Sequence, residues 1–260
     1  SGGIDSALVL ALAVDALGAE RVHAVMMPYT YTAEISVEDA KKQAVDMGCA
    51  FDSIPIQPMV RSFMGGLEPL FANTGRDTTE ENIQARCRGI ILMALSNKYG
   101  KLLLTTGNKS ELAVGYCTLY GDMCGGFAPI KDVPKTLVYE LSRYRNSLGP
   151  AIPERVIERP PSAELAPDQK DEDSLPPYDI LDAIIDGYAE QDMSISELVA
   201  QGYPEESVCR VIQLIERNEY KRQQGAVGPK ITKRNFGKDR RIPITHGYLQ
   251  TILASYKAGQ

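Results

Sequence analysis

Histidine is scarce in the sequence, where His23 and His246 are the only two among 260 residues. That scarcity argues against a histidine-based metal centre and against a Cys–His nucleophile pair. Cysteine is also sparse, odd in number and without a C-x-x-C pair, at Cys49, Cys87, Cys117, Cys124 and Cys209. We therefore expect reduced thiols, as in the cytoplasm, and neither a disulfide framework nor a zinc site.

Long apolar runs are missing too. No stretch approaches the length that spans a bilayer, and no signal peptide is visible, so we expect a cytoplasmic protein without a membrane partner. The net charge of −6 argues against a general nucleic-acid binder. What the chain does have is an ordinary globular composition, with 43% hydrophobic and 24% charged residues. Its length suffices for one large α/β domain or for one domain with an appendage.

The opening residues form the most informative stretch, Ser1-Gly2-Gly3-Ile4-Asp5-Ser6. Two adjacent glycines allow positive φ and a close approach of the backbone to a ligand. An apolar run that predicts a helix begins at Ala7, and a helix start adds its own donors and its positive dipole end. This pattern predicts a seat for phosphate or pyrophosphate. Asp5 would repel phosphate on its own, so its presence favours a magnesium ion between carboxylate and phosphate.

The same six residues have a plainer interpretation, because a Gly-Gly pair by itself indicates only a tight turn. The complete string is more specific. It resembles the pyrophosphate-binding loop of the adenine-nucleotide α-hydrolase-like (PP-loop) enzymes, which split ATP between the α and β phosphates. It is not the P-loop that binds β- and γ-phosphates, since no Gly-Lys-Ser/Thr follows. Such a loop should follow a buried strand, so we expect that residues ahead of Ser1 are missing.

Apolar segments and capping patterns predict the order of helices and strands. Strands are expected over 22–27, 51–56 and 101–106, and helices over 7–17, 36–47, 59–71, 79–99 and 136–148. Ser36 with Asp39, and Thr78 with Glu81, look like helix caps. This order predicts an α/β fold, namely an open parallel sheet with helices on both faces, Rossmann-like and of the adenine-nucleotide α-hydrolase type.

Polar groups follow the third expected strand, whose buried centre we place at 102–104. Glu111 is the second carboxylate expected near the opening loop, where Asp5 and Glu111 could hold one magnesium beside substrate phosphates. The long helix over 79–99 begins polar and ends apolar. Asn82 and Arg86 stand four apart on one of its faces, which suggests a wet cleft, although surface solvation explains the same pattern.

Residues 115–135 are glycine-rich and too long to form a single turn. Loops of that size in compact domains are usually functional. Lys131 and Lys135 close the segment, and a lysine there could meet a phosphate as a point charge. We therefore expect a functional loop here rather than a simple connection.

We expect an ATP-binding core over 1–160 and an acidic mobile loop over 161–177, either a lid or a solvated tract. The acidic residues of that loop are Glu164, Asp168, Asp171, Glu172 and Asp173. Residues 178–260 are expected to form a small helical appendage with a basic stretch over 217–241. That stretch is a solvated tail, an anion-binding lip over the site, or an RNA-binding segment.

The opening string, the segment over 106–135 and the Lys221-Arg222-Gln223 stretch together resemble the NAD synthetase family. More narrowly, they resemble the synthetase domain of its glutamine-dependent members, and the resemblance covers nearly the whole chain. It implies ATP-dependent amidation of deamido-NAD (nicotinic acid adenine dinucleotide) to NAD through an adenylate. AMP and pyrophosphate would be released, and ammonia would come directly or from glutamine. The resemblance also implies Mg²⁺ and a homodimer or higher homo-oligomer.

The resemblance assigns roles residue by residue. It implies ATP contacts at Ser1, Gly2, Gly3, Ile4, Asp5, Ser6, Thr106, Lys135 and Ser162. It implies Asp5 and Glu111 as metal ligands and, with Lys135, as the catalytic residues. It implies contacts to deamido-NAD at Asn82, Arg86, Glu111 and Lys221.

One departure concerns Leu119, where the single-domain, ammonia-using relatives carry a lysine before Tyr-Gly-Asp. That difference favours the two-domain subfamily, so we expect a glutaminase domain of the nitrilase type in the full-length protein. A related PP-loop ATP pyrophosphatase ligase or tRNA-modifying enzyme would share residues 1–6 but would not explain 115–135. A non-catalytic nucleotide-binding module is a third possibility, against which the intact Asp5, Glu111 and Lys135 argue.

Overall fold

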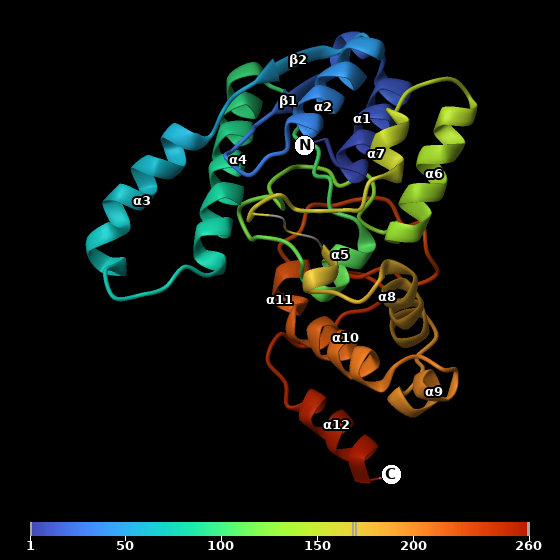
Figure 1. Cartoon of the computed structure of the whole chain (residues 1–260). Coiled ribbons are helices and arrows are strands. Elements are labelled where there is room, and N and C mark those ends of the chain that lie inside the picture. Colours follow the sequence, from blue (N-terminus) through green and yellow to red (C-terminus); the bar gives the residue numbers. More distant parts are fainter. Residues whose placement is uncertain (1, 168, 170, 259–260) are drawn as a thin grey trace.

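The computed structural model describes residues 2–167, 169 and 171–258. A two-stranded parallel sheet lies at the top of Figure 1, where β1 (His23–Met26) pairs with β2 (Ala50–Ser53) in the register His23↔Ala50 to Met26↔Ser53. The helix α2 (Glu34–Asp46) connects the two strands and makes the crossover that a parallel pair requires. The predicted α/β class with a parallel sheet is thereby confirmed.

The strand expected over 101–106 forms only in part. Leu104 makes an isolated parallel bridge with Phe127, and the carbonyl of Leu103 accepts from a backbone amide of the same glycine-rich loop. Leu102 is 67% exposed, so the prediction of a buried apolar centre was wrong. The reason is that, among the described residues, this segment pairs its backbone with the glycine-rich loop instead of lying inside a sheet.

The helix expected over 7–17 is present as α1 (Ile4–Leu17), but it begins earlier than predicted, at Ile4 inside the opening string. It is apolar almost all round because it is enclosed, with α2 on one side and α6 (Lys135–Ser147) and α7 (Glu154–Glu158) on another. Its residues Leu8 and Ala11 are at most 1% exposed. Gly18 ends the helix with a φ of 84°, a conformation that glycine adopts without steric cost.

Two predicted helix caps were placed wrongly. The helix α4 (Thr78–Tyr99) is capped by Asp77, whose carboxylate accepts from the Thr79 amide at 2.7 Å while Glu80 accepts from the Asp77 amide. The predicted pair, Thr78 and Glu81, lies one residue too late. Both Asp and Thr are good N-cap residues, and Asp77 with Glu80 forms the same capping box one position earlier. At α2, Ser36 and Asp39 lie inside the helix and are buried, since the helix already begins at Glu34.

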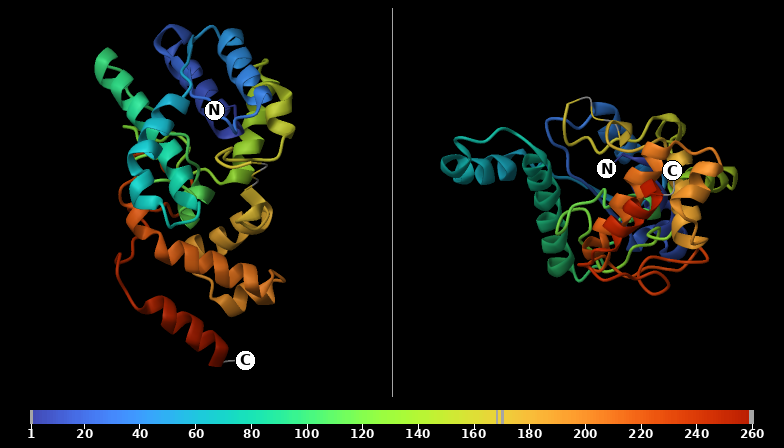
Figure 2. Two further views of the ribbon diagram at one scale, coloured as in Figure 1. Left: turned by 60° about the vertical axis from the view of Figure 1, so that its left-hand side comes forward. Right: turned by 90° about the horizontal axis from the view of Figure 1, so that it is seen from below.

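The remaining helices form a pair and a cluster. The helix α3 (Gln57–Phe71) packs on α4 and stands away from the rest of the molecule (Figure 1 and Figure 2), whereas α4 contacts the body of the protein through side chains such as Arg88, which bonds to the Met27 carbonyl. The cluster lies below the sheet and includes the short α5 (Lys109–Val114), which packs on α8, α10 and α11. Its other members are α8 (Tyr178–Ile185), the π-helical turn η3 (Asp186–Glu190), α9 (Ile195–Ala200), α10 (Glu205–Arg217), α11 (Glu219–Arg222) and α12 (Tyr248–Ala258).

Helix α10 is the centre of this cluster. Its apolar residues at 208, 211, 212 and 215 follow the helical repeat, and all four are 0% exposed. They pack against α5, α8 and α9 and partly against α12. The predicted C-terminal helices are therefore present, and their apolar core also includes Ala113 and Val114 of α5. Within the described ranges, no helix combines the length and the apolar character needed to cross a membrane.

Candidate functional site

The opening turn places the start of α1 against α2. Gly2 has a φ of 81°, and a Cβ atom there would lie 2.3 Å from the Ser36 carbonyl oxygen, so only glycine fits. Gly3 caps α1 in an extended conformation, and the Ser6 hydroxyl donates to the Gly3 carbonyl at 2.9 Å. Arg159 reaches the Gly2 carbonyl at 3.1 Å. The helix N-terminus thus faces the site with the dipole orientation that favours an anion.

A buried lysine joins the two predicted carboxylates. The Nζ atom of Lys135 lies 2.5 Å from Asp5 Oδ2 and 3.3 Å from Glu111 Oε1. The three side chains come from the first turns of three helices, α6, α1 and α5. Lys135 is 1% exposed, whereas both carboxylates keep 17% of their side-chain surface. The structure therefore brings all three predicted catalytic residues together.

Asn108 holds this cluster and was missed by the sequence interpretation. Its side-chain nitrogen donates to Asp5 Oδ1 at 2.8 Å, and its Oδ1 accepts from the Glu111 amide at 3.0 Å. Glu111 Oε2 in turn accepts from the Asn108 amide at 3.4 Å, which completes a capping box for α5. The Asn-Lys-Ser-Glu spacing was the signal that could have revealed it.

Burial and charge set the protonation of the cluster. Burial raises the pKa of Glu111 to about 8, the nearby Asp5 carboxylate adds to that rise, and Lys135 opposes it. Burial alone would lower the pKa of Lys135, but the negative charges of Asp5 and Glu111 outweigh it and raise that pKa. Lys135 therefore remains an ammonium ion, and Glu111 is the group that can change its proton content near neutral pH.

The acidic segment contributes a third carboxylate, which the sequence did not single out for the site. Asp171 is 3% exposed, and its Oδ2 accepts from the Tyr178 hydroxyl at 2.8 Å. The Tyr178 ring lies 5.2 Å from Lys135 Nζ, a cation–π distance. Asp171 Oδ1 has no protein partner in the described structure. Burial and the surrounding carboxylates raise the pKa of Tyr178, so its hydroxyl stays protonated.

A cavity of about 490 Å³ gathers most of the predicted site residues. Its lining includes the predicted residues Gly3, Ile4, Asp5, Ser6, Asn82, Thr106, Glu111, Lys135, Ser162 and Lys221. Gly2 lies instead on the wall of a neighbouring cavity of about 580 Å³. Ser1 and Asp168 lie outside the described residues. Ligand pockets are commonly of this size.

Arg86 is the predicted substrate contact that the structure leaves outside the cavity. Its side chain is exposed, and its Nε donates to the Leu119 carbonyl at 3.2 Å. Arg88, two residues later, lines the cavity, and its Nε donates to the Met27 carbonyl at 3.1 Å. Burial lowers the pKa of Arg88. On α4 a shift of two residues turns a side chain to the opposite part of the helix, so only one of the two can face the site.

Asn82 and Lys221 lie on the wall near the glycine-rich loop. Asn82 Oδ1 accepts from the Thr118 hydroxyl at 2.7 Å. Lys221 Nζ donates to the carbonyls of Gly115 and Cys117 at 2.7 and 2.8 Å. Both side chains therefore shape the beginning of that loop as well as lining the cavity.

Loop residues of the acidic segment cover one side of the cavity. Glu164 has a φ of 51°, and its carboxylate accepts from the Ser36 hydroxyl at 2.5 Å and from the Ala33 amide at 3.3 Å. Ser162, the predicted ATP contact, donates to the Gln169 carbonyl at 2.5 Å. The two Glu164 bonds attach the segment to the beginning of α2, beside the opening turn. Its predicted mobility stays a prediction.

The described part of the chain contains no group of three or more His, Cys, Asp or Glu side chains placed to hold a metal ion. Asp5 and Glu111 provide two carboxylates that share one cation, Lys135. Two protein carboxylates completed by water and phosphate oxygens are a common way to bind Mg²⁺. The donor chemistry therefore fits a magnesium ion that arrives with a nucleotide.

A parallel α/β core with a glycine turn at a helix N-terminus, facing a lysine and two carboxylates, defines a nucleotide-binding protein of the Rossmann-like class. The sequence model of the NAD synthase family matches residues 1–225, and the chain belongs to this family. The glutamine-dependent NAD(+) synthetase of Acinetobacter baylyi is 64% identical over 250 residues, which are 95% of this chain and 46% of that protein. The chain spans about half the length of the curated relatives it matches.

Solved structures agree with this assignment. The glutamine-dependent NAD+ synthetase from Acinetobacter baumannii, in complex with ADP, is 59% identical, with a TM-score of 0.61 over 95% of this chain and 45% of that one. An NMN synthetase from Francisella tularensis is 26% identical, with a TM-score of 0.72 over 89% of this chain and 87% of that one. A glutamine-dependent NAD(+) synthetase from Cytophaga hutchinsonii has a TM-score of 0.79 at 21% identity, which supports the fold.

Proposed function

We propose that this chain amidates deamido-NAD to NAD at the expense of ATP. The nicotinate carboxylate attacks the α-phosphorus, pyrophosphate leaves, and ammonia then displaces AMP from the resulting adenylate. One observation carries the proposal: in a member of the NAD synthase family, Lys135 joins Asp5 and Glu111 on the wall of a cavity that the opening glycine turn borders. No step needs a nucleophile from the protein, in keeping with the scarcity of histidine.

The opening turn would hold the leaving pyrophosphate. Its backbone amides and the start of α1 would contact the phosphates over residues 1–6, and Lys135 would contribute a fixed positive charge. Thr106 and Ser162 would make the remaining ATP contacts. These positions favour in-line attack at the α-phosphorus, since positioning and charge stabilisation dominate phosphoryl and nucleotidyl transfer.

Asp5 and Glu111 would hold the magnesium ion together with phosphate oxygens. When bound, that ion neutralises the charge that develops on the phosphates. The ammonium group of Lys135, 2.5 Å from Asp5, would then be shared with the phosphate oxygens. The bound ion would hold Glu111 as a carboxylate, so the raised pKa of Glu111 applies to the protein without the ion.

Deamido-NAD would lie along the wall formed by α4 and the glycine-rich loop, in contact with Asn82, Glu111 and Lys221. Arg86 remains part of this proposal. Its side chain now bonds to the Leu119 carbonyl, so it would have to move in order to contact the dinucleotide. The acidic segment over 161–177 would close the cavity, because an acyl adenylate exposed to water is hydrolysed. The proposed division is a core over 1–160, this loop, and an appendage over 178–260.

Ammonia would come directly or from glutamine. The curated relatives are named for glutamine and are about twice as long as the matched segment, so we propose a glutaminase domain in the full-length protein. We also propose a homodimer or higher homo-oligomer on the family resemblance. A cytoplasmic location is proposed because all five cysteines are free thiols.

The test is to incubate the protein with ATP, Mg²⁺, deamido-NAD and ammonium, and to measure AMP and NAD. Equal amounts of both products are expected, and omission of any one substrate should abolish them. In a parallel reaction, nicotinic acid mononucleotide is supplied in place of deamido-NAD. This second substrate is tested because an NMN synthetase shares the fold at 26% identity. Turnover of the mononucleotide alone would contradict the proposed substrate, and no turnover of either by folded protein would contradict the activity.

A further inference from the structure

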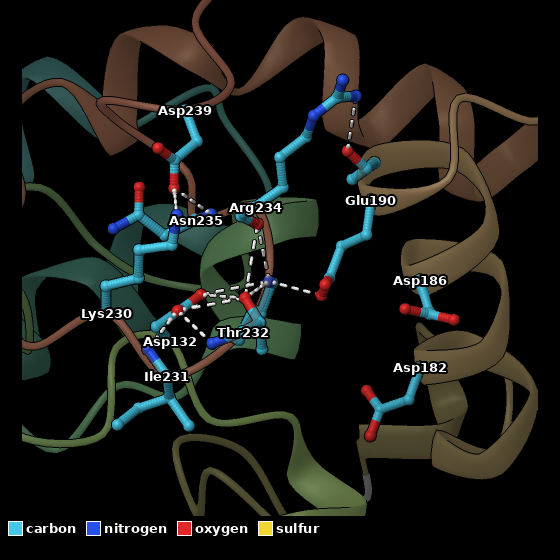
Figure 3. Close-up of polar contacts among 12 residues, drawn as sticks. Asp132, Asp182, Asp186, Glu190, Lys230, Ile231, Thr232, Arg234, Asn235 and Asp239 are labelled. Atoms are coloured by element: carbon cyan, nitrogen blue, oxygen red, sulfur yellow. Dashed lines mark hydrogen bonds and ion pairs between the residues drawn. The ribbon is translucent and has the colours of Figure 1, made fainter.

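Lys109 is a buried cation outside the cluster described above. Its side chain is 1% exposed, and four oxygen atoms surround its Nζ: Asp132 Oδ1 at 3.0 Å, Glu190 Oε1 at 2.8 Å, Thr232 Oγ1 at 2.5 Å and the Arg234 carbonyl at 3.0 Å. Figure 3 shows these four partners converging on one point from different segments. All three hydrogen-bond donors of the ammonium group are thus engaged by protein oxygens.

The arrangement is poorly explained by stability alone. Asp132 and Glu190 have side chains only 2% and 8% exposed, so two carboxylates and one ammonium ion have been removed from water together. The free energy needed to remove three charges from water can exceed the attraction between them. A protein in which apolar residues of the same volume replace such a buried group is often equally stable. A buried and fully hydrogen-bonded network instead fixes one geometry.

The partners of Lys109 belong to three segments far apart in sequence. Asp132 lies in the glycine-rich loop, three residues before Lys135, and Glu190 ends the π-helical turn η3. Thr232 belongs to the basic stretch near the C-terminal end. Asp132 also accepts from the amides of Ile231 and Thr232, at 2.7 and 2.8 Å. Asp132 therefore holds the basic stretch against the glycine-rich loop, and its ion pair with Lys109 joins both to α5.

The same helical turn carries the groups that hold the catalytic cluster. The Lys109 amide donates to the Val133 carbonyl at 2.9 Å, and the Ser110 hydroxyl accepts from the Lys135 amide at 2.8 Å. Asn108, directly before Lys109, bonds to Asp5, and Glu111 bonds to Lys135. Side chains that leave this one turn in different directions thus reach both the catalytic cluster and the Lys109 network.

We infer that Lys109 is a positioning residue: its ammonium group fixes the first turn of α5 against residues 132–135 and so sets Asn108 and Glu111 relative to Lys135. The basic stretch over 230–235 is the outer part of this network rather than a contact to substrate. The inference rests on the proposed function, because the cluster that Lys109 positions is the proposed nucleotide site. Its structural part can be measured without turnover.

The test is Lys109→Met, a neutral side chain of similar length, in the full chain. Amide hydrogen exchange is followed at Ile231 and Thr232, which bond to Asp132, and at Glu111, which bonds to Asn108. We expect exchange to rise about tenfold or more at all three amides. We expect kcat to fall about 10- to 100-fold, with KM for ATP changed by less than about threefold, because misplaced groups reduce catalysis more than binding.

Two further variants keep the test decisive. Glu216→Gln is the matched control, because Glu216 is buried and its partners Tyr188, Arg240 and His246 belong neither to α5 nor to the four groups around Lys109 Nζ. It should lower stability while leaving kcat and the Glu111 amide unchanged. Thr232→Val removes one partner of Lys109 and leaves both carboxylates paired, so it is useful if Lys109→Met fails to fold. It should raise exchange at Glu111 and lower kcat by a smaller factor.

The results separate this inference from the proposed function. The inference would be overturned if, in Lys109→Met or Thr232→Val, exchange becomes faster at Ile231 and Thr232 but not at the Glu111 amide. Lys109 would then stabilise only the contact between the basic stretch and the glycine-rich loop. An equal fall of kcat in Glu216→Gln would overturn it as well. If the parent protein shows no turnover, the proposed function fails, whereas coupled exchange at Glu111 still supports the link between Lys109 and α5.

Discussion

The Asn108 side chain donates a 2.8 Å hydrogen bond to Asp5, across 103 positions of sequence. Through it, the N-cap of α5 orients one oxygen of the carboxylate whose other oxygen contacts Lys135 at 2.5 Å. The same amide group caps the helix that carries Glu111. Asn108 therefore links Asp5 to the first turn of the helix that carries Glu111, beside the ammonium group of Lys135, which contacts both carboxylates.

Asn108→Ala should separate this orienting role from simple capping. Loss of the cap should lower the free energy of unfolding by about 1 kcal/mol, and loss of the bond to Asp5 should reduce kcat by about tenfold. Ser194→Ala is the matched control, because Ser194 forms the same capping box with Glu197 at the beginning of α9. Chemical denaturation and steady-state kinetics measure both effects. Equal loss of kcat in the two variants would refute the orienting role of Asn108.

Asp5→Ala should abolish turnover and leave the fold intact. The variant removes a carboxylate that accounts for two of the polar contacts in the cluster, and a proposed ligand of magnesium. We expect kcat to fall by more than about 100-fold while the circular dichroism spectrum stays unchanged. Lys135 keeps Glu111 as a partner, so no buried charge is left alone. Wild-type activity in Asp5→Ala would exclude this residue from the metal site.

Lys221→Ala should raise KM for deamido-NAD more than KM for ATP. Its ammonium group lies on the cavity wall beside Asn82, bonded to two carbonyls at the beginning of the glycine-rich loop. Loss of one charged contact to a dinucleotide is expected to cost about 1.5–3 kcal/mol, or roughly 10- to 100-fold in KM. Arg86→Ala is the comparison, since Arg86 is exposed beside Leu119 and should have a smaller effect. Equal changes in the KM for ATP and the KM for deamido-NAD would mean that Lys221 does not contact deamido-NAD specifically.

The sequence predicted the helices better than the sheet. The apolar run after the opening string and Gly18 were enough to locate α1, because both signals are local. Whether residues 101–106 pair as a strand depends on what lies beside them, and the observed partner is Phe127, in a loop without a strand pattern. Pairing between distant segments leaves no trace in the periodicity of either one.

The site residues divide in a similar way. Asp5 and Glu111 were expected together from the polar groups that follow the third predicted strand, and the family resemblance added Lys135 to them as a catalytic residue. Asp171 was predicted to belong to an acidic mobile loop, either a lid or a solvated tract, because sequence composition cannot tell that Tyr178 and the α5 cluster bury one carboxylate among several exposed ones. Burial is decided by the packing of other elements, so the sequence could not separate Asp171 from its acidic neighbours.

Glu111 should make the stability of the protein depend on pH in a direction opposite to that of an ordinary carboxylate. Its pKa is raised from 4.5 to about 8 by burial and by Asp5, so the folded protein holds this proton more tightly than the unfolded chain. The stabilisation is therefore complete below 4.5 and is lost as the pH rises through about 8. In Glu111→Gln no such proton exists, and that part of the pH dependence should disappear.

The measurement is the free energy of unfolding of both proteins, by urea, across this pH range without nucleotide. Wild type should lose stability relative to Glu111→Gln with rising pH, and the steepest change should fall between the two pKa values. Added Mg²⁺ and ATP should reverse the effect, because a cation bound at Asp5 and Glu111 favours the charged carboxylate. Parallel pH profiles for the two proteins would mean that Glu111 is already ionised over this pH range, with both carboxylates charged beside the single ammonium group of Lys135.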